Sequence, residues 1–188
     1  TLATCKPEIR KSARVGDWVV GTGSANKKIN RGGHLVHAMK VTEIIPTQDY
    51  WKDDRFQRKK PKLGGSWLNA SGDNIYEQSQ DGKWIQLPSY HSRSDGEQRM
   101  DHTRKDTRVP SVLISQDYVY FGGMGPRIPD EVATNGATSL IKCGIGYFKI
   151  TDGILINNFE QWVRGLGDWG YIGEPWDWIV RMKYDQRG

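Results

Sequence analysis

The 188-residue sequence has no apolar run near the roughly 18 residues that a membrane-spanning helix needs, and no secretory leader is visible. It has only two cysteines, Cys5 and Cys143, and neither lies in a C-x-x-C spacing. These scarcities argue against a membrane protein and against a cysteine-based metal or redox motif, and we expect a reduced, cytoplasmic protein. Methionine is missing from the start, so we expect that the chain begins inside a longer protein or has lost an upstream segment.

What the sequence does contain is typical of one loop-rich domain over residues 1–188. Eight tryptophans, eight tyrosines and 22 glycines indicate aromatic anchors joined by turns. The net charge of +5 favours polyanionic partners only weakly. Six lysines and arginines gather in residues 52–62, beside Trp51 and Phe56, where they would bind phosphates and stack on bases or would simply be a solvated loop.

Alternation and turn residues predict more strands than helices. Strands are expected over residues 18–23, 34–45, 74–78, 83–87, 111–115, 117–123 and 140–150, and helices near 47–56, from Pro129 and over 153–166. Asp81-Gly82 predicts a hairpin turn, and Thr47 is the expected cap of the first of these helices. Residues 89–109 are polar without apolar periodicity and are expected to be a loop. We therefore predict an α+β fold with a curved, mainly antiparallel sheet or open barrel and a few peripheral helices.

The histidines leave several kinds of chemistry open. His34 and His37 are three apart on a predicted strand, so they point to opposite faces and do not form a metal pair. His102 and Asp106 would share a helix face if their segment were helical, and with His91 they could hold a metal. This arrangement matches no recognised zinc spacing, so we assign no metal ligand. Acid–base catalysis by His91 or His102 needs fewer assumptions than a metal site, because histidine titrates near neutral pH.

Two further motifs point to anions. Lys6 and Arg10 lie one helical turn apart before the first strand and could clamp a phosphate, or could face water. The glycines at 21–24 lack the pattern of a dinucleotide site or P-loop and are more typical of a turn. Serines and cysteines occur without a nucleophile-elbow context.

Several blocks, in this order along the chain, carry a family resemblance: CKPEIRKSARVGDWVVGTGS, HLVHAMKVTE, DYWKDDRFQRKKP, GDNIYEQSQDGKWIQLPSYHS, VLISQDYVYFG and FEQWV. The sequence resembles the nucleotide modification associated domain 2 family of bacteria and phages, over a core of residues 1–165, with residues 166–188 as a tryptophan-rich extension that we expect to pack back on the body. The positions that match the family's polar residues are Cys5, Lys6, Arg10, Gly16, Asp17, Lys60, Gly72, Asp73, Asn74, Tyr76, Gln86, Ser89, His91 and His102.

The resemblance implies a nucleotide or nucleic-acid ligand linked to DNA base modification, and by analogy a fold like PUA, ASCH or EVE modules. It implies neither a particular cofactor nor a reaction, so whether the protein is an enzyme stays open. In the leading hypothesis Lys6 and Arg10 neutralise phosphate, Tyr76 or Trp84 stacks on a base, and Asn74 and Gln86 read its edge. Ser89 and Lys60 complete the expected ligand-binding set.

Two alternatives come from other function classes. In the first, the protein is an enzyme acting on a nucleotide or modified base, with His91 and His102 as acid, base or metal ligands and Asp73 or Asp106 in support. In the second, it is a protein-interaction module that uses the basic residues 52–62 and the tryptophan-rich extension.

Overall fold

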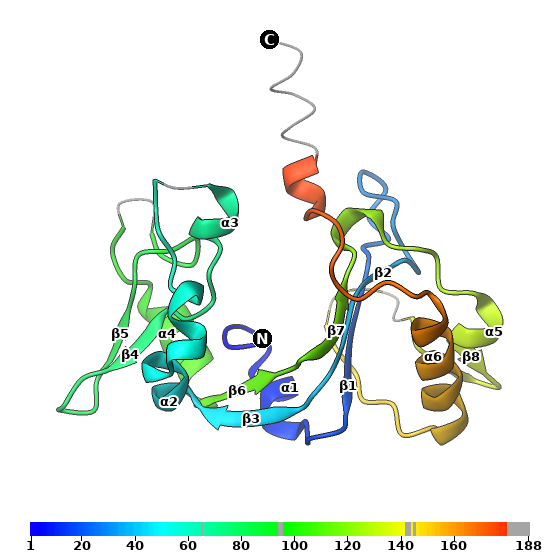
Figure 1. The fold of residues 1–188 in the computed structure, drawn as a ribbon, viewed down its shortest axis with the longest axis horizontal. Helices are drawn as coiled ribbons and strands as arrows, with labels where there is room; N and C mark the ends of the chain where they lie inside the picture. Colours follow the sequence, from blue (N-terminus) through cyan, green and yellow to red (C-terminus); the bar gives the residue numbers. More distant parts are fainter. Residues whose placement is uncertain (65, 94–95, 142–143, 145, 180–188) are drawn as a thin grey trace, which may run out of the picture. The chain divides into compact units, whose positions relative to one another are not determined.

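The second predicted strand, residues 34–45, divides at Val41 and Thr42 in the computed structural model of the chain (Figure 1). The structure describes residues 1–64, 66–93, 96–141, 144 and 146–179. Two compact units result: a first unit of residues 1–17 and 41–115, and a second unit of residues 18–40 together with the described residues from 116 onward. We expected one domain over the whole chain. Whether the two units fold as one stays a prediction.

The first unit consists of short elements around a small aromatic core. Its elements are α1 (Pro7–Ser12), β3 (Glu43–Pro46), α2 (Thr47–Lys52), η1 (Asp54–Lys59), α3 (Trp67–Ala70), β4 (Tyr76–Gln78), β5 (Trp84–Gln86), α4 (Met100–Thr107) and β6 (Ser111–Ile114). Strands β3 and β6 pair antiparallel, as do β4 and β5. Tyr50 of α2 packs on Phe56 of η1, with 4.6 Å between the ring centroids. Val112 and Ile114 of β6 complete this core.

The second unit is a four-stranded sheet with a helix packed on one face. Its elements are β1 (Trp18–Thr22), β2 (Leu35–Lys40), β7 (Asp117–Tyr120), η2 (Gly122–Met124), α5 (Asp130–Ala133), β8 (Thr134–Asn135), β9 (Thr138–Ser139), α6 (Gly153–Gly165) and β10 (Gly170–Tyr171). The sheet order is β1-β2-β7-β10, and only the pairing of β10 with β7 is parallel within this sheet. Phe159 and Val163 of α6 pack against Ala38 and Val119 of the sheet, which confirms the helix predicted from apolar spacing.

Three sequence-based expectations fail locally, each for a visible reason. The predicted loop 89–109 contains helix α4, whose buried residues are the polar Thr103 and Asp106, so apolar periodicity could not reveal it. The described part of the predicted strand 140–150 is not a strand, and Gly144 and Gly146 have positive φ there. Thr47 does not cap α2. It is the first helical residue, and its N–H donates to the carbonyl of Pro110.

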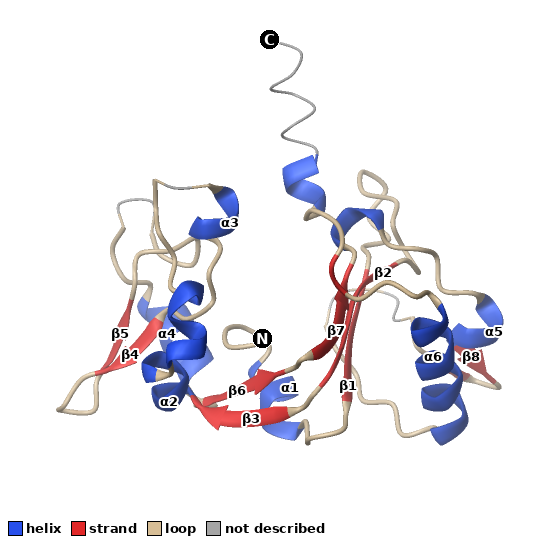
Figure 2. Ribbon diagram, in the orientation of Figure 1, coloured by secondary structure: helices blue, strands red, loops and turns tan. Residues whose placement is uncertain are grey.

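The α+β class is confirmed, and Figure 2 shows helices and strands in both units. The strands form several small sheets, mostly antiparallel, and those of the described residues close no barrel. No helix among these residues is long and apolar enough to cross a membrane.

The described part of the tryptophan-rich extension, residues 166–179, packs on the rest of the second unit, as expected for closely spaced aromatic side chains. Tyr171 stacks on Tyr120 of β7, with ring centroids 5.3 Å apart and 10° between the planes. A Cβ on Gly123 would lie 3.1 Å from Trp176, so this glycine permits close packing of the extension on η2.

An ionic cluster joins the sheet of the second unit to α6. Glu160 accepts a hydrogen bond from Lys40 at 2.8 Å and lies 3.1 Å from Arg164, which also pairs with Asp117 at 2.8 Å. The hydrogen bond from Lys40 is the main cause that lowers the pKa of Glu160 to about 2. A carboxylate with a lowered folded pKa stabilises the protein above its unfolded pKa, and this contribution is lost as the pH falls toward the folded value.

We expect Glu160→Gln to cost about 1 kcal/mol of unfolding free energy at pH 7, a value that allows for solvent screening of the cluster. The difference from wild type should shrink between about pH 5 and pH 2, because acid removes the same charge from wild type. Urea unfolding at several pH values measures this. Glu131→Gln, at an exposed position of α5, is the control, and an equal pH dependence in both variants would contradict the assignment.

Candidate nucleotide site in the first unit

Buried polar side chains are concentrated in the first unit. Eight polar or charged residues other than tyrosine are buried in the part of the chain that the structure describes, and all belong to this unit: Thr4, Arg10, Thr47, Asn74, Gln86, Ser89, Thr103 and Asp106. A buried polar group is costly unless it is hydrogen-bonded. The partners of these groups therefore show which are structural and which lead to the surface.

Asp106 of α4 is the centre of the largest network. One carboxylate oxygen accepts the N–H of Cys5 at 2.9 Å, and the other accepts the hydroxyl of Tyr76 at 2.9 Å. The Tyr76 hydroxyl in turn accepts from Nε2 of Gln86 at 3.3 Å. Burial, and then the neighbouring Asp106, raise the pKa of Tyr76, so its hydroxyl stays protonated and donates. The network links α4 to both strands of the β4–β5 hairpin and to the segment before α1.

Arg10 is buried and binds backbone carbonyls instead of facing solvent. Its guanidinium donates to the carbonyls of Cys5 at 3.0 Å, Ser111 at 2.8 Å and Asp106 at 2.6 Å, and also to that of Val109. These four bonds occupy four of its five N–H groups. Burial lowers the pKa of Arg10, while Asp106 opposes this effect. Arg10 was predicted to clamp a phosphate. In this structure its guanidinium instead holds three chain segments together by hydrogen bonds: the one before α1, the end of α4 and the start of β6.

Lys6 and Cys5 lie at the surface, next to the hydrogen bonds of Arg10. Both have left-handed backbone conformations, with φ of 40° for Lys6 and 56° for Cys5, which are unusual for residues other than glycine. Lys6 is exposed and precedes α1, so it does not share a helix face with Arg10. The Cys5 thiol is free, and burial together with Asp106 raises its pKa, which disfavours a reactive thiolate. Cys143 lies outside the described residues.

The two amides expected to read a base edge are buried in separate networks. Nδ2 of Asn74 donates to the carbonyls of Tyr50 at 3.1 Å and Phe56 at 3.2 Å. Gln86 donates to Tyr76, and its Oε1 accepts the N–H of Arg99 at 2.9 Å. In this structure both side chains therefore act as internal braces of the first unit.

His91 and His102 lie beside the Asp106 network, which reaches His91 through its main-chain carbonyl, at 3.5 Å from Nε2 of Gln86. Their rings lie 6.4 Å apart at a 62° angle, and both side chains are half-buried. Burial lowers the pKa of His91, with Asp106 opposing and His102 adding to the effect, so its imidazole is neutral at neutral pH. Ser89 is buried beside them, and its Oγ accepts the N–H of His91 at 3.2 Å. Two half-buried imidazoles next to a buried polar network are suited to hydrogen-bonding a ligand or moving a proton.

The remaining predicted residues lie outside this network. Asp73 accepts the hydroxyls of Tyr50 at 2.7 Å and Thr1 at 2.6 Å. The ammonium of Lys60 lies 3.5 Å from the centroid of the Trp51 ring. Trp84 is half-buried and shares a hairpin face with Gln86, as strand alternation requires.

Of the predicted site residues, hydrogen bonds connect five in this network, Arg10, Tyr76, Gln86, Ser89 and His91, and the ring of His102 lies beside that of His91. The centre of the network, Asp106, was considered only as a metal ligand with His102 or as a supporting group for the two histidines in an enzyme. The i, i+4 spacing of His102 and Asp106 on α4 was the signal that could have found it, because that segment is indeed helical. Among the described residues no three His, Cys, Asp or Glu side chains are placed to hold a metal ion.

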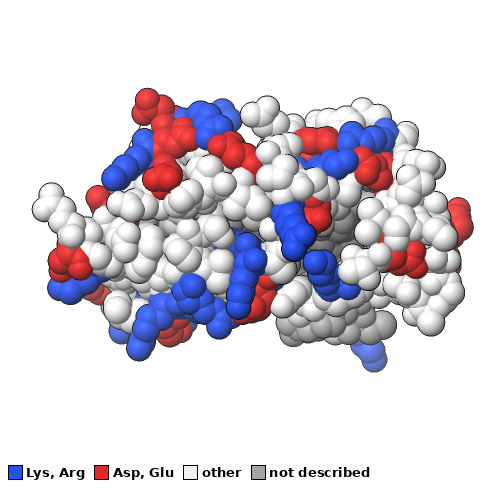
Figure 3. All heavy atoms as spheres, turned by 90° about the horizontal axis from the view of Figure 1, so that it is seen from below, with Lys and Arg blue, Asp and Glu red and all other residues white. Residues whose placement is uncertain are grey.

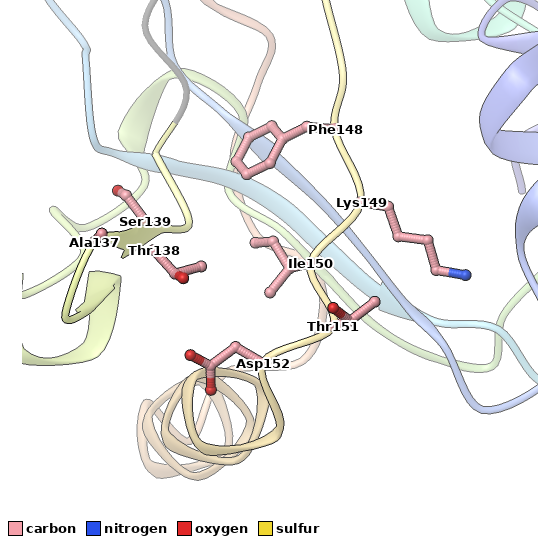
Figure 4. Close-up of a pocket in the computed structure, with 8 residues that line it drawn as sticks. All are labelled: Ala137, Thr138, Ser139, Phe148, Lys149, Ile150, Thr151 and Asp152. Carbon is pink, nitrogen blue, oxygen red and sulfur yellow. The ribbon is translucent and has the colours of Figure 1, made fainter.

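Two surface hollows lie away from this network. The first, of about 590 Å³ in the second unit, is lined by residues 137–139 and 148–152 (Figure 4). Its one carboxylate, on Asp152, already caps α6 and accepts from Asn135 at 2.8 Å. The second, of about 600 Å³ in the first unit, is lined by Gln48, Lys52, residues 77–80 and Gly82.

A family model described as nucleotide modification associated domain 2 matches residues 1–182. The chain belongs to this family. The match includes most of the tryptophan-rich extension, which we had placed outside the family core. Comparisons with curated proteins and with solved structures found no significant match.

Proposed function

We propose that this nucleotide modification associated domain 2 protein binds a nucleotide or a nucleic-acid base through the first unit. The observation that carries the proposal is the buried Asp106–Tyr76–Gln86 network, which reaches the main chain of His91, whose ring lies 6.4 Å from that of His102. The two rings offer hydrogen-bonding nitrogens and flat faces for stacking. The family description supports a nucleotide as the ligand.

The fold type and the cellular location that we propose rest on analogy. A polar interior between a hairpin and helices is compatible with a PUA-, ASCH- or EVE-like module, and a cytoplasmic location suits a partner of nucleotides or DNA. Trp84 and Lys60 remain candidates for stacking and phosphate contacts at the edge of the same unit. Here Arg10, Tyr76, Asn74 and Gln86 act as scaffold, and the histidines are the ligand contacts next to this network.

We expect a panel of nucleotides, modified nucleosides and short DNA to contain at least one ligand that raises the thermal midpoint. His91→Ala with His102→Ala should weaken its binding by about tenfold, because one or two net hydrogen bonds are lost. Calorimetry with the full chain, with and without divalent metals, gives the affinities. His34→Ala in the second unit is the matched control and should change nothing. Stabilisation by no member of the panel would refute the proposal.

An enzyme acting on a nucleotide or modified base is the second candidate, favoured by the lowered pKa of His91 beside His102. A neutral imidazole next to a second one can accept a proton from a substrate while the other donates. The same panel, followed by mass spectrometry of the ligands, separates the candidates. Turnover that falls by about 10²–10⁴ in His91→Ala, with affinity within tenfold, would identify an enzyme.

A further inference from the structure

The basic segment, which we define as residues 52–62, contains six lysines and arginines and lies on the surface of the first unit. The proposed function above does not use it, apart from Lys60. Over the face drawn in Figure 3, basic side chains lie among acidic ones, so the net charge alone defines no site. A site for an anionic ligand is therefore indicated by which cations of the segment are not already paired with carboxylates.

The segment is anchored to the protein, unlike a solvated loop. The buried Asn74 side chain binds the carbonyl of Phe56, and its N–H binds the carbonyl of Lys59 at 3.1 Å. Phe56 itself is buried against Tyr50. The cations of η1 and its flanks are thus displayed by a fixed backbone, which lowers the entropic cost of binding.

Only one cation of the segment is neutralised by carboxylates among the described residues. Arg55 pairs with Glu43 at 2.8 Å and with Asp53 at 2.6 Å. Lys60 rests on the Trp51 ring. No ion pair joins the other four to an acidic residue in the described part of the chain; these are Lys52, Arg58, Lys59 and Lys62.

We infer that the basic segment contacts the phosphodiester backbone of a nucleic-acid strand. This inference rests on the proposed function and names its ligand as a polymer. Arg58 and Lys59 lie in η1, Lys52 ends α2, and Lys62 follows η1, so the four unpaired cations are spread along the segment. Phosphates along one strand are spaced by about 3.4 Å of helix axis, so cations spread in this way can meet several successive phosphates, more than a nucleoside monophosphate offers.

Salt dependence of DNA binding tests the inference. The probes are a fluorescently labelled DNA duplex and its single strand, and the full chain is titrated at several salt concentrations. Arg58→Gln and Lys62→Gln should each lower the slope of log Kobs against log[salt] by about one, uniformly across sequences. Arg55→Gln and Lys83→Gln are the controls, because both cations are already paired, Lys83 with Asp81 at 2.7 Å. Neither control should change the slope.

Each outcome decides the inference. A smaller slope in Arg58→Gln and Lys62→Gln alone supports it, and the probe that binds more tightly at the same salt concentration identifies duplex or single strand as the ligand. Equal effects in the controls, unchanged slopes, or no binding of either probe would overturn it. Failure of the histidine variants to affect nucleotide binding would leave this result untouched, so the two proposals fail separately.

Discussion

Replacing Asp106 with alanine is expected to lower the free energy of unfolding by about 3–5 kcal/mol. The side chain is 4% exposed and accepts hydrogen bonds from Tyr76 and from the Cys5 N–H. Without it the buried Tyr76 hydroxyl and the partly buried N–H of Cys5 lose their acceptor, and the buried guanidinium of Arg10 loses the nearby negative group that offsets its burial. Urea denaturation of the wild type and the variant measures the change.

Asp101→Ala is the matched control for this variant. Asp101 belongs to the same helix, and its side chain is 69% exposed, with Arg99 at 3.5 Å and His102 at 3.8 Å as ionic neighbours. Such exposed pairs are worth less than about 1 kcal/mol. A loss below about 1 kcal/mol in Asp106→Ala, or an equal loss in Asp101→Ala, would contradict the central place of Asp106. Asp106→Asn adds a second test, since an amide of the same shape replaces one of the two acceptor oxygens by a donor NH2 group and should still cost more than the control.

Sequence reasoning succeeded where the signals were local. Asp81-Gly82 predicted the hairpin turn, and Gly82 has a φ of 80° there. Apolar spacing predicted α6 because its buried side chains are apolar and one helical turn apart. In both cases neighbours along the chain decide the conformation, so a short stretch of sequence is sufficient.

The same reasoning missed what depends on distant carbonyls. Asn74 looked like a ligand reader, but its partners Tyr50 and Phe56 lie 24 and 18 residues away, and no local pattern indicates them. Arg10 binds carbonyls about 100 residues further along the chain for the same reason. The sequence therefore singled out polar residues that do matter to the structure. Their role is to hold the first unit together by hydrogen bonds more than to contact a ligand.

Gly72→Ala is expected to destabilise the protein by about 3 kcal/mol, at the upper end of overpacking effects. A Cβ at this position would lie 2.0 Å from the carbonyl oxygen of Lys59 and 3.0 Å from the nitrogen of Pro61. Both are backbone atoms, so no side-chain rotation can relieve the contact. The carbonyl of Lys59 must move, and its hydrogen bond from Asn74 is lost with it.

Gly165→Ala is the control, because nothing lies within 4 Å of a Cβ at that helical position of α6. It should be neutral or stabilise by up to about 1 kcal/mol. Thermal and urea unfolding compare the two variants. Because Gly72 packs against the basic segment itself, Gly72→Ala should also reduce the salt slope of DNA binding at temperatures where it remains folded. If Gly72→Ala causes no loss of stability, the basic segment is not held as it is in the structure. The inference that its cations are preorganised for binding would then be wrong.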